Sequence, residues 1–380
     1  MDALTTPSNW QKVRLGDIAE IIGGGTPSTQ VTSFWNGSIN WFTPTEIGIT
    51  KYVYKSQRTI TPLGLKKSSA KLLPIGTILL TSRASIGDCA ILKEVATTNQ
   101  GFQSLIPLEK INNEFLYYLI LTLKNKLLKL ASGSTFLEVS PNKIKNLLIP
   151  LPPLNEQIAI ANILSTLDRY LYSLDALILK KESVKKALSF ELLSQRKRLK
   201  GFNQNWQRVR LGDICEITTG SLDANEMVHY GKYRFYTCAK EYYFIDKYAF
   251  DTEAILISGN GAYVGYVHYY KGKFNAYQRT YVLDNFSEHI IFVKYFLTMF
   301  LQSHIQTNKN EGNTPYIVMA TLKDFKIFLP PLNEQIAIAN ILSDVDSEII
   351  SLKNKKRQFE NIKKALNHDL MSAKIRVLKK

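Results

Sequence analysis

Arginine, asparagine and glutamine recur in short loops rich in glycine and serine, and these side chains could do recognition chemistry on a nucleic acid. Residues 81–87 read TSRASIG and residues 98–103 read TNQGFQ. Arginine pairs with two acceptors of guanine, asparagine or glutamine pairs with adenine, and small residues allow close backbone approach. The first half therefore offers these candidate DNA contacts: Arg83, Ser85, Asn99, Gln100, Gln103, Ser134 and Thr135.

The second half carries loops of the same kind. We interpret residues 258–265 (SGNGAYVG), 276–280 (AYQRT) and 310–316 (NEGNTPY) as counterparts of the loops at 81–87, 98–103 and 131–136. Taken singly, such side chains are more often ordinary surface polar groups. The second set of candidate DNA contacts is Ser258, Asn260, Tyr263, Gln278, Arg279, Asn313 and Thr314.

The charge balance favours a polyanionic partner. The chain has 48 Lys and Arg against 32 Asp and Glu, a net charge of +16. Nucleic acid is the first partner to expect at such a charge, and a basic face that merely meets solvent is the alternative. Much of the excess lies in two tails: residues 180–200 hold eight basic and two acidic residues, and residues 353–380 hold ten and two.

Enzyme motifs are missing from the sequence. It has no GxxxxGK[ST], GxSxG or HExxH pattern, and all five histidines fall in the second half. The missing motifs argue against a self-contained nuclease or methylase, which is the enzymatic alternative to a DNA-reading protein without catalytic activity. The three cysteines show no CxxC spacing, which argues against a metal site or disulfide framework and fits a reducing cytoplasm. No apolar run reaches the ~18 residues of a membrane span.

The chain repeats one plan twice. LPPLNEQIAIANILS at residues 151–165 recurs without change at 329–343, and NWQKVRLGDIAEI at 9–21 recurs as NWQRVRLGDICEI at 205–217. Each half therefore reads as a short opener, a long variable block, a helix start and a basic tail. We expect the segments that are alike to have the same role in both halves, and the unlike blocks to have two different roles of one kind.

The repeated helix starts open two long helices. Apolar residues alternate at spacings of four and three, the pattern of a coiled-coil seam. No glycine or proline interrupts residues 155–195, so we expect a helix of ~40 residues, ~60 Å long, in each half, and the two as an antiparallel pair. Two ordinary core helices are the alternative. The expected seam is Ile160, Leu164, Leu167, Leu171, Leu174, Ile178, Val184, Leu188 and Leu192, then Ile338, Leu342, Val345, Ile349, Leu352, Phe359, Ile362, Leu366 and Leu370.

The variable blocks predict the α+β fold class. A strand is expected at 77–81 (TILLT) and at 254–257 (AILI), and a helix at 113–130 and at 288–305. The predicted domains are 1–150, helix 151–200, 201–328 and helix 329–380.

These features together resemble the specificity subunits of type I restriction-modification systems. The resemblance rests on the openers at Trp10 and Trp206, GGTPST at 24–29, the loops at 81–87 and 98–103, and the doubled LPPLNEQ segments. It implies two target recognition domains separated by two antiparallel helices, in a non-catalytic subunit that reads a bipartite, asymmetric DNA site. It also implies two methyltransferase subunits and, through them, motor-nuclease subunits as partners, with S-adenosylmethionine, ATP and magnesium bound by those partners. The second half lacks the sequence motifs GGTPST, TSRA and TNQG.

The repeated helix starts would then present two equivalent docking sites for two identical methyltransferase subunits, and the helix pair would set the gap between the two DNA words. A stand-alone DNA-binding protein and a coiled-coil scaffold without sequence preference are the alternatives. The candidate docking residues are Asn155, Glu156, Gln157, Ile158, Ile163 and Leu167, with Asn333, Glu334, Gln335, Ile336, Ile341 and Val345 in the second copy.

Overall fold

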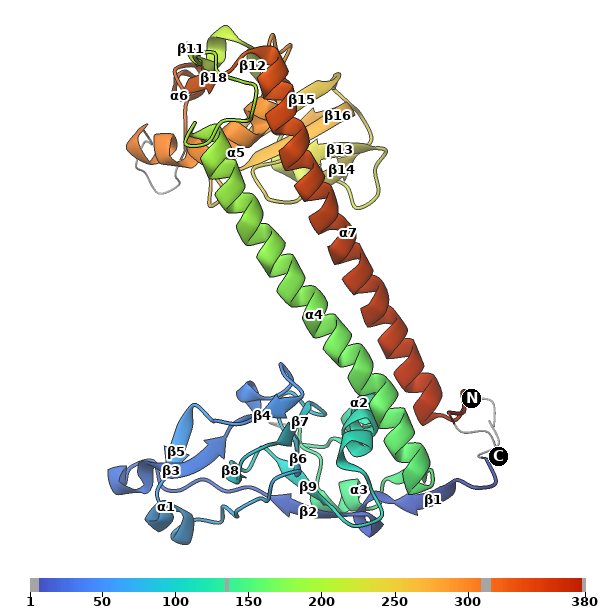
Figure 1. Cartoon of the computed structure of the whole chain (residues 1–380). Helices are drawn as coiled ribbons and strands as arrows, with labels where there is room; N and C mark the ends of the chain where they lie inside the picture. Colours follow the sequence, from blue (N-terminus) through green and yellow to red (C-terminus); the bar gives the residue numbers. More distant parts are fainter. Residues whose placement is uncertain (1–6, 134–136, 309–315, 378–380) are drawn as a thin grey trace. The chain divides into compact units, whose positions relative to one another are not determined.

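The computed structural model describes residues 7–133, 137–308 and 316–377. The chain forms two compact units (Figure 1): unit 1 joins residues 1–175 with 355–380, and unit 2 comprises residues 176–354. These units differ from the predicted domains, because each long helix contributes one part to each unit. Among the described residues, no helix combines the length and the apolar character needed to cross a membrane.

Unit 1 is an α+β body built on three sheets. Its strands are β1 (Gln11–Arg14), β2 (Ala19–Gly23), β3 (Trp35–Phe42), β4 (Tyr52–Val53), β5 (Arg58–Ile60), β6 (Ile78–Leu80), β7 (Cys89–Leu92), β8 (Ala96–Thr98), β9 (Gln103–Pro107) and β10 (Leu148–Leu151). They pair in the orders β2-β9-β6-β7-β4, β5-β3-β8 and β1-β10. The helices of the block are α1 (Pro62–Lys66), α2 (Asn113–Leu130) and α3 (Pro141–Lys145).

Helix α2 shows how the sequence builds this unit. The side chain of Asn112 caps the helix by accepting from the N–H of Phe115 at 2.9 Å. The helix buries Phe115, Leu116 and Leu119 in the same core cluster as Ile78 and other strand residues. The helix predicted at 113–130 is confirmed, and so is the strand predicted at 77–81, which the structure places at β6.

Unit 2 repeats the architecture with a larger sheet. Its strands are β11 (Gln207–Arg210), β12 (Glu216–Thr219), β13 (Tyr233–Tyr236), β14 (Tyr243–Ile245), β15 (Phe250–Ser258), β16 (Val267–Ala276), β17 (Thr280–Asp284) and β18 (Lys326–Leu329). They form a six-stranded sheet in the order β12-β17-β15-β16-β13-β14 and a β11-β18 pair. The helices are α5 (Ile290–Asn308) and α6 (Met319–Lys323), and β15 contains the strand predicted at 254–257.

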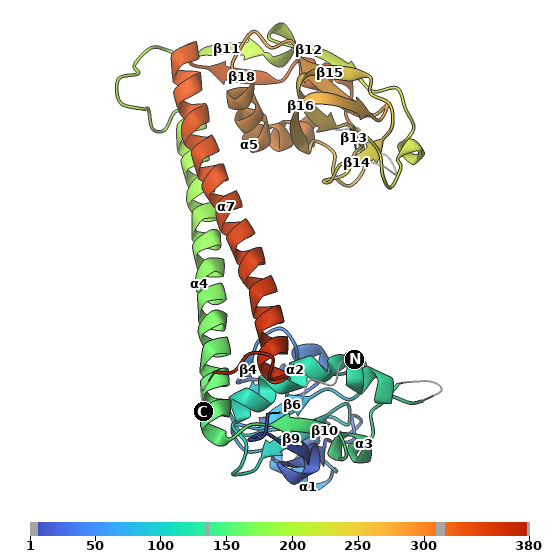
Figure 2. The same ribbon diagram turned by 90° about the vertical axis from the view of Figure 1, so that its right-hand side faces the viewer.

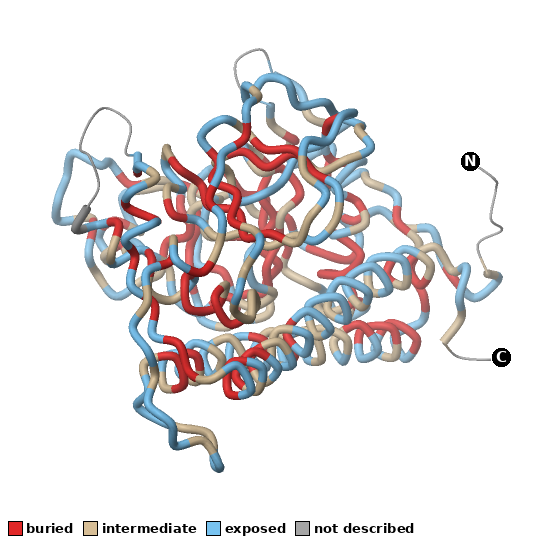
Figure 3. Tube along the Cα trace, turned by 90° about the horizontal axis from the view of Figure 1, so that it is seen from above, coloured by how far each residue is buried: buried red, intermediate tan, exposed pale blue. Residues whose placement is uncertain are grey.

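The two long helices are confirmed. Helix α4 (Leu154–Leu193) and helix α7 (Leu332–Met371) each have 40 residues, and they pair (Figures 1 and 2). Ion pairs join Asp168 to Lys363 in unit 1 and Lys185 to Asp346, at 2.5 Å, in unit 2. Moving forward along α4 therefore means moving backward along α7, which is the antiparallel arrangement. Buried residues gather in the α+β body of each unit and, on the long helices, mainly near the helix ends (Figure 3).

The predicted seam needs one correction in each helix. Val184 and Ile362 are 48% and 42% exposed, so neither lies in the seam. The alternation of four and three that begins at Ile160 continues through Lys181 and Lys185, and the off-register Val184 falls outside it. On α7 the same alternation runs through Lys356 and Lys363. These four seam lysines are tolerated because each has an acidic partner on the other helix: Glu348, Asp346, Asp175 and Asp168.

A polar cluster joins the block of unit 1 to the helix pair. The hydroxyl of Tyr118 on α2 donates to Asp168 on α4, and Lys363 of α7 pairs with the same carboxylate. Burial raises the pKa of Tyr118, and the bond to Asp168 raises it further. The same trio recurs in unit 2 as Tyr295, Asp346 and Lys185, with 2.7 Å between Tyr295 Oη and Asp346 Oδ2.

Candidate nucleic-acid interface

Three loops of unit 1 meet at one end of its sheets. The N–H of Ser82, after β6, donates to the carbonyl of Gly101 at 2.8 Å, and the N–H of Val139 donates to the carbonyl of Ser82 at 3.1 Å. The predicted loops at 81–87 and 98–103 are thereby brought together with the turn that follows α2. We call this group the first loop cluster.

A glycine-rich segment completes the first loop cluster. The N–H of Gly25 donates to the carbonyl of Thr98 at 2.8 Å, and the Thr26 hydroxyl donates to the side chain of Gln100. A Cβ added at Gly24 would lie 2.0 Å from the carbonyl oxygen of Asn99, so only glycine fits there. GGTPST therefore packs against the loop that carries the candidate readers.

Arg83 belongs to this cluster and contacts two of its other segments, at Gly101 and Glu138. Its Nη2 lies 2.8 Å from Oε2 of Glu138, and the side chains of the pair are 41% and 32% exposed. Ser85 is half-buried and Gln100 is exposed, while Asn99 accepts from the N–H of Gly101 at 2.8 Å to hold its own turn.

Two candidate readers lie in the interior. Gln103 in β9 is 6% exposed and Ser258 in β15 is fully buried. Both are strand residues whose side chains point into the packing beneath the loops, which sequence alone did not reveal. Their burial argues against the predicted direct contact with DNA, because neither side chain reaches the exposed surface of its loop cluster. Four other candidates lie outside the described residues: Ser134, Thr135, Asn313 and Thr314.

Unit 2 forms a second loop cluster with the same backbone connections. The N–H of Gly259 donates to the carbonyl of Arg279 at 2.8 Å, and the N–H of Ile317 donates to the carbonyl of Gly259 at 2.9 Å. Gly220 repeats the role of Gly24, because a Cβ there would lie 1.9 Å from the carbonyl oxygen of Ala276.

The candidate side chains of this second cluster differ in their partners. Tyr263 is exposed, with the Lys240 ammonium 5.2 Å from its ring centre. Gln278 donates to Asp223 at 2.8 Å, and Asn260 is half-buried. Arg279 is exposed and makes no ion pair with any residue that the structure describes.

These shared bonds fix which residues correspond. Ser82 corresponds to Gly259 and Gly101 to Arg279, so the counterpart of Arg83 is Asn260. An isolated β-bridge confirms the match, since Arg83 faces Glu138 and Asn260 faces Tyr316. The two arginines chosen from the sequence therefore occupy different positions in the two clusters. The two loop clusters therefore share a frame of backbone hydrogen bonds, but they carry different side chains at matching positions.

One loop in each cluster was missed at the sequence level. The N–H of Asn99 donates to the carbonyl of Phe42 at 3.0 Å, and that of Tyr277 donates to the carbonyl of Tyr236 at 2.9 Å. The segments after β3 and β13 therefore join the clusters. In unit 2 this segment, residues 237–242, reads TCAKEY, and its basic and aromatic residues were a usable signal.

The repeated NEQ residues lie mostly inside the protein. Glu156 is 2% exposed and accepts from Trp10 Nε1 at 3.1 Å and from Arg376 Nε at 2.8 Å. Gln157 accepts from the N–H of Asn112 at 2.8 Å. Their counterparts behave alike: Glu334 binds Trp206 and Arg198, and Gln335 accepts from the N–H of His289 at 3.0 Å.

The predicted docking residues therefore divide into two groups. In the buried group, Glu156 and Glu334 hold the opener and the basic tail, whereas Gln157 and Gln335 hold the segments before α2 and α5. Asn155 and Asn333 are exposed, and their side chains accept from the next backbone N–H at 2.9 Å. The other exposed members are Ile158, Ile163 and Ile336, whereas Leu167, Ile341 and Val345 are half-buried.

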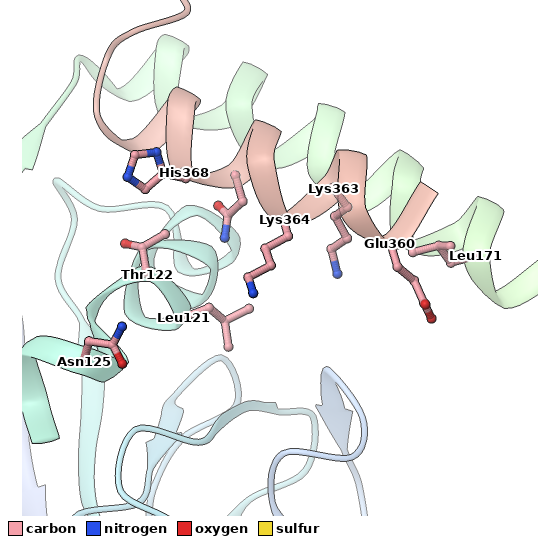
Figure 4. A pocket seen from close by; sticks show the side chains of 9 residues that line it. Leu121, Thr122, Asn125, Leu171, Glu360, Lys363, Lys364 and His368 are labelled. Atoms are coloured by element: carbon pink, nitrogen blue, oxygen red, sulfur yellow. The ribbon is translucent and has the colours of Figure 1, made fainter. Parts of the chain in front are cut away.

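A groove lies beside the helix pair in each unit. In unit 1 it is lined by Leu121 and Thr122 of α2, Leu171 of α4, and Lys363 and Lys364 of α7 (Figure 4). The groove of unit 2 occupies the equivalent place and is lined by Thr298, Met299, Ile349, Lys185 and Lys186. The surface beside the helices is therefore duplicated along with the fold.

A family model described as "Type I restriction modification DNA specificity domain" matches residues 7–181 and again residues 203–361. The chain belongs to this family. The two matches coincide with the two repeats, so each half is one specificity domain of the family. The resemblance seen in the sequence is thereby confirmed.

Individual relatives agree with the family assignment. The chain is 29% identical over 413 residues to the type I restriction enzyme MjaIX specificity subunit of Methanocaldococcus jannaschii, covering 98% of this chain and 94% of that protein. It is 37% identical over 171 residues to the EcoDI specificity subunit of Escherichia coli, 44% of this chain and 37% of that one.

Solved structures of family members share the fold. The S subunit of a type I restriction-modification system from M. genitalium superposes with a TM-score of 0.63 at 19% identity, over 97% of both chains. The HsdS subunit from Thermoanaerobacter tengcongensis gives 0.54 at 18% identity, over 98% of this chain and 99% of that one. The chain therefore shares its overall fold with these solved members of the family.

Proposed function

We propose that this specificity subunit reads a bipartite, asymmetric DNA site, with one word read by each loop cluster. The observation that carries the proposal is the common backbone frame with unlike side chains at matching positions. Arg83 stands where the other cluster has Asn260, and Gly101 stands where the other has Arg279. Because arginine and asparagine prefer different bases, equal frames with unequal side chains favour two different words.

Selection from a random pool of DNA duplexes by the full-length chain tests this proposal. We expect two short unlike words separated by bases without preference. Affinity for unrelated duplexes should fall steeply with salt, because lysine and arginine contacts release counterions from the phosphates. A palindromic motif, or a pool without enrichment as a scaffold would give, contradicts the proposal.

We also propose that the chain is non-catalytic and docks two methyltransferase subunits, one on each unit, and through them motor-nuclease subunits. The duplicated exposed surface supports this: Ile158 and Ile336 are 42% and 39% exposed at equivalent places on the helix starts. Exposed apolar side chains that recur on a repeated surface are typical of interaction sites. S-adenosylmethionine, ATP and magnesium would be bound by those partners.

Single charge substitutions test the docking. Ile158→Glu should remove one methyltransferase subunit from the complex, Ile336→Glu the other, and the double variant both, as seen by native mass spectrometry. Leu63→Glu, at a leucine on α1 that is 47% exposed, is the matched control and should keep both subunits. Two bound methyltransferase subunits in the double variant would contradict the docking site. DNA selection by the chain alone tests base recognition independently of this result.

A further inference from the structure

The backbone around Arg83 is fixed, and among the described residues its side chain makes one ion pair, with Glu138. The carbonyl of Gly101 accepts from the N–H of Ser82 at 2.8 Å and from that of Arg83 at 3.3 Å. Ala84 follows with a positive φ of 52°, which turns the loop sharply. The guanidinium itself is held by Glu138, through the 2.8 Å ion pair.

The loop frame does not require a carboxylate at position 138. The second loop cluster builds the same frame and the same β-bridge with Tyr316 at the matching place, opposite Asn260. An acidic side chain beside a DNA-binding loop is also electrostatically unfavourable, because it repels the phosphates. The role of Glu138 therefore concerns the side chain of Arg83 and not the backbone of the loop cluster.

The chemistry of the pair explains what this carboxylate contributes. A guanidinium has five N–H donors in a rigid plane, so one bond to Glu138 leaves donors free for two acceptors elsewhere. Arg83 keeps 41% of its side-chain surface exposed while it is paired. Holding a long side chain in one plane before binding removes the entropy cost of ordering it on the DNA.

We propose that Glu138 is a positioning residue that orients Arg83 to read guanine. The inference rests on the proposed function, because it needs the first loop cluster to read bases. With Glu138 in place, the free donors of Arg83 meet O6 and N7 of one guanine in a fixed plane. Without it, the side chain samples many rotamers, contacts phosphates as readily as bases, and loses discrimination.

Selection from a random duplex pool by full-length variants tests the inference. Arg83→Ala should lower the preference for guanine at one base pair by about 5- to 150-fold. Glu138→Ala should lower the preference for guanine at that same base pair by at least about twofold, as expected for coupled neighbours. Glu138→Gln, whose amide oxygen can still accept from Arg83, should have a smaller effect. The other word should stay sharp in all three variants.

A matched control removes an equivalent charge elsewhere. Glu253 pairs with Lys271 at 3.1 Å and is 33% exposed, so Glu253→Ala loses a similar ion pair in unit 2 and should leave the first word intact. Thermal melting of every variant reports folding separately. A lower melting temperature in Glu138→Ala with an unchanged first word would mean a purely structural role and overturn the inference.

The outcomes separate this inference from the function beneath it. If the wild-type chain selects no motif, the proposed function fails and this inference with it. If Arg83→Ala leaves the motif sharp, Arg83 does not read a base and Glu138 has nothing to orient. If Arg83→Ala broadens one position and Glu138→Ala does not, the inference about Glu138 alone is wrong.

Discussion

Arg198 donates two hydrogen bonds to the fully buried carboxylate of Glu334, from Nε to Oε1 at 2.8 Å and from Nη2 to Oε2 at 2.7 Å. The arginine belongs to the tail after α4 and the glutamate to the first turn of α7. Arg376 and Glu156 repeat the bond in unit 1. Each helix start is thereby clasped to the tail that ends the other helix.

Loss of this clasp should destabilise unit 2 strongly. Arg198→Ala leaves Glu334 buried and charged without its cation, which costs about 3–5 kcal/mol in the free energy of unfolding. Adding Glu334→Gln should recover part of the loss, because the unpaired charge disappears. Lys247→Ala, which breaks an exposed pair with Glu226, is the control and should lie near the detection limit. Chemical denaturation measures all of these, and equal losses for Arg198→Ala and Lys247→Ala would contradict the clasp.

The stability contributed by Tyr118 should fall at high pH. Burial and the bond to Asp168 raise its pKa in the folded state, whereas an unfolded tyrosine ionises near pH ~10. The contribution is therefore complete below pH ~10 and declines as the pH rises toward the folded pKa. Tyr118→Phe cannot ionise at this position, so its deficit in the free energy of unfolding against wild type should be constant from pH ~8 to pH ~10 and should narrow between pH ~10 and pH ~11. Denaturant titrations across this range measure the deficit, and a constant deficit would refute the assignment.

The second loop cluster should read its word without help from the first. Arg279→Ala and Asn260→Ala should each weaken one base preference in the second word by ~1–3 kcal/mol if they contact base edges. The first word should remain as in wild type, because both residues lie in unit 2. Motifs selected from random duplexes by the two variants give the answer. A change in the first word would show that the clusters do not read separately.

The length of the helix pair should set the gap between the words. Four residues inserted after Leu174 in α4 and four after Leu352 in α7 add ~6 Å of helix, and seven in each add ~10.5 Å. Because the helices are antiparallel, matched insertions preserve the flanking pairs Asp168–Lys363 and Lys185–Asp346. At ~3.4 Å per base pair, the gap should grow by one or two base pairs with four residues and by about three with seven.

Seven residues also keep the phase of the seam, whereas four shift it slightly. The seven-residue variant is therefore the control for register. Selected motifs should keep both words in both variants. A folded variant that binds the original gap would show that the helices are not the ruler.

The sequence predicted what depends on local pattern. The spacing of apolar residues and the absence of glycine and proline were enough to predict α4 and α7, because helix periodicity is local. The sequence also predicts that Lys185 lies on or near the seam, because the four-and-three alternation continues past Ile178. The sequence could not predict that a lysine is tolerated there, because its partner Asp346 lies on the other helix.

The roles that sequence could not assign depend on distant contacts. Glu156 looked like a docking residue because it is repeated and polar, yet Trp10 and Arg376 hold it inside the fold. Arg83 and Arg279 were both predicted to contact DNA from loops that are not counterparts, and the backbone bonds show which single residues match: Arg279 corresponds to Gly101. A repeated motif indicates that a residue has a role, but the residues that it contacts in the fold are needed to assign that role.

The duplicated clasp also bears on how such a chain can change its specificity. Each block meets the helices through the same bonds: a tryptophan, a buried glutamate, a glutamine and an arginine from the opposite tail. A block with different loops that keeps its own tryptophan would make the same contacts at either helix start. The contacts between block and helices are therefore interchangeable between the two units. We therefore expect that exchange of a whole block changes the DNA word that is read, while these contacts with the helices stay the same.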